Sequence, residues 1–127
     1  MNQKPDPLDN FGRFVMQNLR DRALQHVDGL AQGQWRAPGL QSLQAELAKL
    51  DDDERNVVRR CVRAAIDSAV HDFLFALQEH GDGDGSIQVL VYDQNVASLS
   101  DGLHGEPYSE DGWQARFSEF GQAPETA

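Results

Sequence analysis

Basic side chains are almost missing from the last third of this sequence. Between Asp82 and Ala127 there are nine carboxylates and one base, Arg116, so this stretch carries a formal charge of about −8. The first 81 residues hold the other ten bases and twelve acids, and the net charge of the chain is −10. Phosphate backbones and anionic lipids repel such a surface. We therefore expect no direct binding to nucleic acid and none to a membrane.

Cysteine and long apolar runs are also scarce. The single cysteine, Cys61, excludes an internal disulfide, and no apolar run reaches the roughly 18 residues that cross a bilayer. The segment from Met1 to Asn10 is polar and does not resemble a signal segment. These features favour a cytoplasmic protein. A chain of 127 residues with 39% hydrophobic content predicts a single domain over 1–127, with disordered tails at 1–8 and 122–127.

Glycine and proline are absent from Asp52 to His80, and this is the strongest structural signal in the chain. Asp51 and Glu54 have the spacing of a capping box at the start of a helix. At about 1.5 Å per residue, the predicted helix is ~40 Å long. Its second half is mostly Ala, Ile, Val, Phe and Leu. We expect this helix to lie at the centre of the fold.

Two shorter helices are predicted before the long one. Apolar residues recur every three or four positions from Phe11 to Leu30, which predicts a helix with one buried face. Asp9 or Asn10 is the expected cap, and Gly29 or Gly33 the expected end. This face consists of Phe11, Phe14, Val15, Leu19, Ala23, Val27 and Leu30. A second helix is expected over 40–50.

The segment after the long helix predicts a small β-hairpin and a last helix. Ile87 to Tyr92 is rich in β-branched and aromatic residues and is typical of a strand, and Val96 to Leu99 is the expected return strand. Ser109 is the expected cap of a C-terminal helix that ends at Gly121. The predicted fold class is therefore α+β, predominantly helical, with a long central helix, a small hairpin and a C-terminal helix.

The helical spacing of the aromatic residues predicts that most of them lie in the core, with the alternative that one or two lie on an interface. Cys61 is expected there as a small apolar side chain. The aromatic set is Trp35, Trp113, Phe11, Phe14, Phe73, Phe75, Phe117 and Phe120.

Four polar residues form a strip on the apolar half of the long helix. They are Asp67, Ser68, His71 and Asp72. Asp67 and His71 are four positions apart, as are Ser68 and Asp72, so each pair can touch across one turn. A carboxylate beside an imidazole orients the ring, as a general base or a metal ligand requires. The alternative is that the strip is the solvated face of the helix.

A second group of polar residues lies in one loop. It consists of Asp101, His104, Glu106 and Tyr108, with Glu110 and Asp111 after them. These side chains could contact a partner, converge on a cation, or serve only to form turns. The preceding GDGDG segment is not an EF-hand loop, because Ile87 occupies the sixth position, where that loop needs glycine.

Four arginines cluster on the first half of the long helix. They are Arg55, Arg59, Arg60 and Arg63. Guanidinium groups in a row can bind anions. The alternative is internal pairing, either with nearby acids such as Asp67 or with the acidic last third of the chain.

Two classes of function fit these observations. In size, acidity and α+β class the chain resembles the bacterial immunity proteins that cover the basic active sites of nuclease toxins. That resemblance implies a non-catalytic protein-interaction module with a basic protein partner, no catalytic residues, and no metal or cofactor. The alternative is a small enzyme or a metal- or ligand-binding domain in which the 101–108 loop folds over the long helix and brings His104 to His71. A homodimer through the predicted strand or the long helix is compatible with either function.

Overall fold

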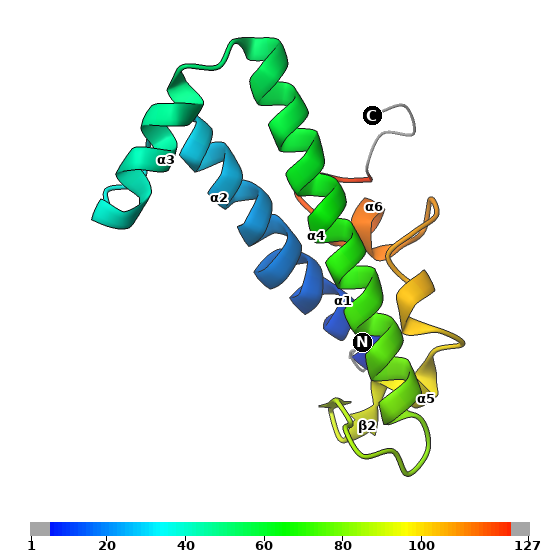
Figure 1. The fold of residues 1–127 in the computed structure, drawn as a ribbon. Coiled ribbons are helices and arrows are strands. Elements are labelled where there is room, and N and C mark those ends of the chain that lie inside the picture. The colour runs from blue at the N-terminus through cyan, green and yellow to red at the C-terminus, as the bar shows by residue number, and fades with distance from the viewer. Residues whose placement is uncertain (1–5, 123–127) are drawn as a thin grey trace, which may run out of the picture.

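The computed structural model describes residues 6–122. Helix α1 (Pro7–Val15), a π-helical turn η1 (Met16–Arg20) and α2 (Asp21–Ala31) follow one another without a break. The long helix α4 (Asp52–Gly81) runs back alongside them in the opposite direction (Figure 1). The predicted mainly helical α+β class with a long central helix is confirmed.

The first helix begins earlier than the sequence predicts. Asp6, not Asp9 or Asn10, is its N-cap, and the Asp6 carboxylate accepts a hydrogen bond from the Leu8 backbone N–H at 2.9 Å. Pro7 occupies the first helical position, where its missing N–H costs nothing. The predicted disordered tail at 1–8 is therefore wrong for its last residues, and residues 1–5 lie outside the described part.

The π-helical turn changes which face of the first helix is buried. A π-turn holds one more residue than an α-turn, so the residues after it are rotated relative to those before it. The buried positions around the turn are Phe11, Gly12, Met16, Arg20, Asp21 and Leu24. Phe14 and Leu19 were predicted to be buried, but they are 64% and 47% exposed. The regular 3.6-residue period assumed from the sequence fails at Leu19, which lies inside the π-turn. Phe14 precedes the turn, in α1, where the buried residues are Phe11 and Gly12.

Helix α4 has the predicted start and end but a narrower buried stripe. Asp51 and Glu54 form the predicted capping box, with hydrogen bonds of 2.8 and 3.0 Å. Its fully buried residues are confined to the C-terminal half: Val70, Leu74, Leu77 and Gly81. Phe73, Phe75 and Cys61 were expected in the core, and all three are exposed.

Helix α3 (Pro38–Ala48) packs on α2 at the far end of the molecule from the hairpin (Figure 1). Gln44 attaches the helix to the preceding loop, because its side-chain amide accepts from the Trp35 N–H at 3.0 Å and donates to the Trp35 carbonyl at 2.8 Å. Trp35 itself is 37% exposed, so its predicted place in the core is wrong. Leu47 is the buried apolar contact of this helix.

The hairpin is shorter than predicted. Strands β1 (Leu90–Val91) and β2 (Gln94–Asn95) pair in antiparallel fashion, with Leu90 opposite Asn95. The predicted return strand is wrong: α5 (Val96–Leu99) is a single helical turn. Asn95 caps this turn by accepting from the Ala97 N–H at 3.1 Å, and such a side-chain cap favours helix over strand.

The C-terminal segment folds over α4 through short helices. A 3₁₀ turn, η2 (Leu103–Gly105), contacts α4, and α6 (Trp113–Phe117) contacts α1. Ser109 is not the cap of α6: it has a positive φ of 79°, and α6 begins only after Gly112. Phe120 lies beyond the helix, which is therefore shorter than predicted.

The main cluster of buried apolar residues lies at the hairpin end of the molecule. It combines α1, η1, the second half of α4, α5, η2 and α6. Trp113 and Leu103 are its most completely buried large members from the C-terminal segment. At the other end, α2 and α3 bury only a few apolar side chains, namely Leu24, Val27, Leu30 and Leu47.

Gly12 provides a test of the contact between α1 and α6. A Cβ at this position would overlap the indole ring of Trp113, which is 1% exposed and cannot move into solvent. We expect Gly12→Ala to lower the free energy of unfolding by about 1–3 kcal/mol, although alanine favours helix. Gly39→Ala is the control, since it also lies in a helix and has nothing within 4 Å of the new Cβ. Equal urea midpoints for both variants would contradict this contact.

Candidate functional site

Asp67, the first residue of the polar strip, has a structural partner. The Nε of Arg20 donates to Asp67 Oδ1 at 2.7 Å, and the Arg20 side chain is completely buried. The same guanidinium donates to Ser118 Oγ and to the Gly121 carbonyl, both at 2.7 Å. Asp67 is therefore occupied by Arg20 rather than by His71. This ion pair joins the first helix, the long helix and the C-terminal segment.

Asp21 completes the buried network around Arg20. Its carboxylate accepts from the hydroxyl of Ser118 and from the Glu119 N–H, the latter at 2.9 Å. The residue is 4% exposed. Sequence reasoning missed both Arg20 and Asp21. The available signal was an arginine four positions after Met16 and four before Leu24, on one helical face.

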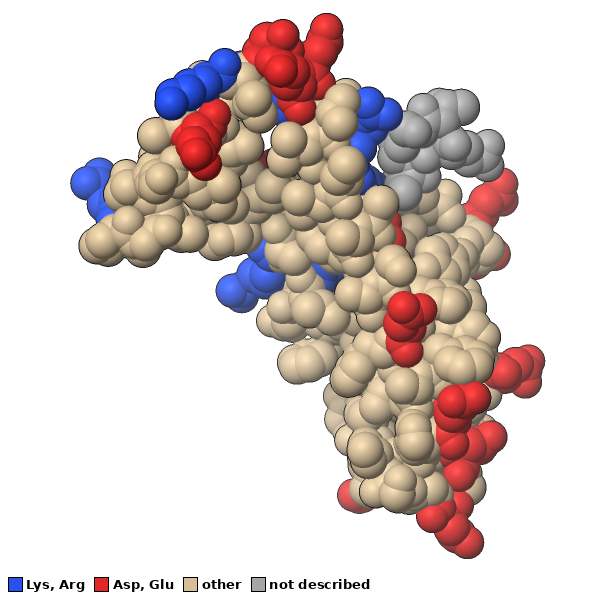
Figure 2. Space-filling model, in the orientation of Figure 1, with Lys and Arg blue, Asp and Glu red and all other residues tan. Residues whose placement is uncertain are grey.

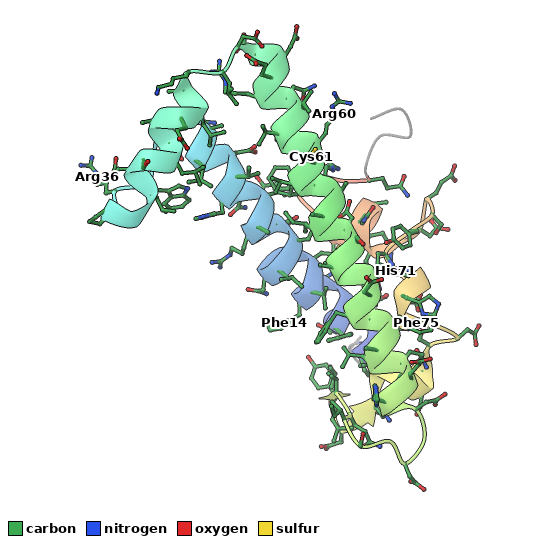
Figure 3. All side chains as sticks on the ribbon, in the orientation of Figure 1. Phe14, Arg36, Arg60, Cys61, His71 and Phe75 are labelled. Atoms are coloured by element: carbon green, nitrogen blue, oxygen red, sulfur yellow. The ribbon has the colours of Figure 1, made fainter. Side chains whose placement is uncertain are left out.

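The structure brings His71 and His104 together. Their ring centroids are 5.5 Å apart, and the ring of Tyr108 lies 6.2 Å from that of His71. The ring of Phe75 packs on His104 at 4.9 Å. The 101–108 loop therefore folds over α4, as the enzyme or ligand-site alternative requires. Figure 3 shows His71 and Phe75 on the same side of α4.

The cluster of His71, His104, Tyr108 and Phe75 contains one buried polar atom that the described residues leave without a hydrogen-bond partner. The Nδ1 of His104 is buried and has no hydrogen-bond partner among residues 6–122. Burial raises the pKa of Tyr108, and the carboxylate of Asp67 raises it further. His71 lies 3.2 Å from Asp72 through its Nδ1. Within residues 6–122, however, no group of three or more His, Cys, Asp or Glu residues is arranged to hold a metal ion.

The other predicted site residues lie apart from this cluster or have local partners. Ser68 and Asp72 on α4 are exposed, and so is Asp101 in the loop. Glu106 is half-buried and accepts a hydrogen bond from the Ser100 hydroxyl at 3.0 Å, which is turn chemistry. Glu110 and Asp111 are exposed in the turn before α6.

Most of the arginine row on α4 is used inside the fold. Arg55 pairs with Asp52 at 2.6 Å, and Arg59 pairs with Asp28 at 2.7 Å. Arg63 donates to backbone carbonyls of the C-terminal segment, including that of Phe120 at 3.0 Å. Burial lowers the pKa of Arg63, and the charge of Arg20 lowers it further. Within this row, Arg63 therefore holds the C-terminal segment through backbone carbonyl groups and not through its carboxylates.

The acidic surplus is not neutralised inside the described fold. Among residues 6–122, the Lys and Arg ion pairs are Arg20 with Asp67, Arg55 with Asp52, Arg59 with Asp28, and Arg116 with Asp9. None of them uses a carboxylate between 82 and 111. Arg116, the one base of the acidic third, pairs with Asp9 of α1 at 2.9 Å and also donates to the backbone carbonyl of Asp111 at 2.7 Å. Figure 2 shows carboxylates gathered around the C-terminal end of α4 and the loop after it.

An apolar groove lies on the other side of α4 from His71. It has a volume of about 310 Å³ and runs between α1, η1 and α4 to Val89. Phe14 and Phe73 stand at its mouth and are 64% and 58% exposed. Figure 3 shows Phe14 and His71 on opposite sides of the long helix. The sequence did not predict this groove, because both phenylalanines have the spacing of core residues.

Comparisons with family models, with curated proteins and with solved structures found no match to this chain. Among residues 6–122, no helix has both the length and the apolar character that a membrane span needs.

The Arg20–Asp67 contact can be tested by its effect on the free energy of unfolding. Asp67→Asn leaves a completely buried guanidinium without its counter-charge, and we expect the free energy of unfolding to fall by about 3–5 kcal/mol. Asp28→Asn is the control, because the Arg59 and Asp28 side chains are 36% and 31% exposed, and it should cost at most about 1 kcal/mol. Urea unfolding measures both. Similar small losses would contradict the assigned role of Asp67.

The ionisation of Tyr108 reports on its burial in the folded chain. Its folded-state pKa is raised above the 10.0 of free tyrosine, mainly by burial. The neutral phenol therefore stabilises the folded state fully below pH 10.0, and this contribution is lost as pH rises through the folded pKa. Tyrosinate absorbance of the native chain minus that of Tyr108→Phe should titrate with a midpoint above 10.0. A lower midpoint would mean that the phenol is fully hydrated.

Proposed function

We propose that this chain is a small non-catalytic protein-interaction module that presents an acidic surface to a basic partner. The observation that carries the proposal is the absence of any Lys or Arg ion pair to a carboxylate between 82 and 111, within the described residues. These carboxylates are available to a partner without loss of a native ion pair. Complementary charge raises the association rate and disfavours wrong partners.

The acidic surface has a defined place on the molecule. It covers the end of α4, the hairpin turn and the loops around η2 and α6. All of its carboxylates are exposed except that of Glu106, which is half-buried. Its members are Asp82, Asp84, Asp93, Asp101, Glu106, Glu110 and Asp111. Repulsion from phosphates and anionic lipids argues for a protein partner rather than nucleic acid or a membrane.

The resemblance to bacterial immunity proteins supports the same kind of role. Those proteins are also small and acidic, and they act by covering a basic surface of another protein. We place the chain in the cytoplasm as part of this proposal. Cys61 is a free, exposed thiol, which suits a reducing compartment.

The second candidate function is a ligand or metal site at His71 and His104. The 5.5 Å approach of the two rings is the observation that favours it. Two imidazoles without a third ligand make a weak cation site, since structural and catalytic zinc sites use at least three protein ligands. Titration of the purified chain with Zn²⁺, followed by calorimetry, would distinguish the two. Micromolar binding that His104→Ala abolishes would favour the ligand site.

The charge argument predicts a position-dependent effect on association. We expect a basic partner recovered from the native host to associate at least tenfold more slowly at physiological salt than at low salt. Asp84→Asn with Asp101→Asn should slow association further. The matched control is Glu46→Gln with Asp53→Asn, which removes the same charge from α3 and the start of α4. Surface plasmon resonance measures the rates. Equal slowing by both double variants, or no salt dependence, would contradict the proposal.

A further inference from the structure

We propose that the apolar groove between α1, η1 and α4 docks an amphipathic helix of the basic partner. The apolar side chains of that helix would pack on Phe14, Leu19 and Phe73, and its Lys or Arg residues would lie over the hairpin. This inference rests on the proposed function and adds to it where the partner binds and what the partner presents.

The groove has the chemistry of a helix-binding site. None of its lining residues is charged; they are Phe11, Phe14, Val15, Asn18, Leu19, Val70, Phe73, Leu74, Leu77 and Val89. Phe11, Val70, Leu74 and Leu77 form its buried floor. Phe14, Leu19 and Phe73 are 64%, 47% and 58% exposed, so they are available to a partner. Helix-in-groove recognition uses such an apolar trough with a few anchor positions about one turn apart.

The acidic segment beside the groove favours a basic helix. Val89 lines the groove and belongs to the segment 82–93, which contains Asp82, Asp84 and Asp93 and no base. All three carboxylates are exposed, and none forms an ion pair with a described Lys or Arg. A helix in the trough therefore reaches negative charge at this end. Lys or Arg at that end of the partner would be attracted, and Asp or Glu would be repelled.

A second copy of this chain fits the groove less well. Two copies would each bring a net charge of −10. Phe14 and Phe73 each offer on the order of 100 Å² of apolar surface, given the 150–250 Å² of a whole aromatic side chain, and the smaller Leu19 offers less. Their sum is well below the roughly 800 Å² per partner of a standard interface. One helix with a charged end can use a patch of this size.

Three synthetic helical peptides and the full chain provide the test. The first peptide carries leucines on one face at positions i, i+3 and i+7, with a lysine cluster at one end. The second has the same composition with the leucines dispersed around the helix, and the third has glutamates in place of the lysines. Fluorescence anisotropy at low salt measures binding. We expect the first peptide to bind at least tenfold more tightly than either of the others.

Two matched variants locate the binding. Phe73 and Phe75 are the same residue type, two positions apart on α4, and 58% and 43% exposed, but Phe75 packs on His104, away from the groove. We expect Phe73→Ala to weaken binding of the first peptide at least tenfold and Phe75→Ala to leave it unchanged. Circular dichroism checks that both variants are folded, and Phe14→Ala should repeat the effect of Phe73→Ala.

The outcomes separate the groove from the acidic surface. If both lysine peptides bind alike and Phe73→Ala has no effect, the groove is not the site, and the acidic-surface proposal stands. If the glutamate peptide binds as well as the first, the partner is not basic and both proposals fail. Sedimentation decides the remaining case: a dimer of the native chain that Phe73→Ala dissociates would show that a second copy occupies the groove.

Discussion

The buried guanidinium of Arg20 is the constraint on which the rest of this structure depends. A charge removed from water must have partners, and Arg20 obtains them from Asp67 on α4 and from Ser118 and Gly121 near the end of the described chain. Three segments that are far apart in sequence are held together at one point. Asp21 then fixes Ser118 from the other side, so the contact also sets the path of the C-terminal segment over the long helix.

The first continuous helical segment carries both this buried charge and part of the apolar groove. The π-turn ends at Arg20 and places both Arg20 and Met16 fully inside. Leu19, inside this turn, is left 47% exposed. Helix α4 then buries Val70 and Leu74 but leaves Phe73 at the edge. The apolar groove lies between these elements and includes the exposed Phe14, Leu19 and Phe73.

Local signals predicted the elements that depend on local interactions. The extent of α4, its capping box and the short α3 all follow from nearby residues, and so does the mainly helical class. The failures need information from distant residues. Nothing near Arg20 shows that Asp67, 47 positions away, makes its burial tolerable. From the sequence, the approach of His104 to His71 could only be stated as a requirement of the enzyme or ligand-site alternative. The excess of acids in the last third followed from composition. That the carboxylates between 82 and 111 form no ion pair with a described Lys or Arg could be seen only in the structure.

The uneven distribution of buried side chains implies that some helices unfold locally at a lower free-energy cost than others. At the hairpin end, α1, α4, α5, η2 and α6 share one apolar cluster with Trp113 inside it. Helix α3 is held mainly through Leu47 and the two Gln44 hydrogen bonds to Trp35. Partial unfolding costs least where few contacts are lost. Amide protons of α3 should therefore exchange with solvent through a local opening, while those of α4 around Asp67 exchange only when the whole chain unfolds.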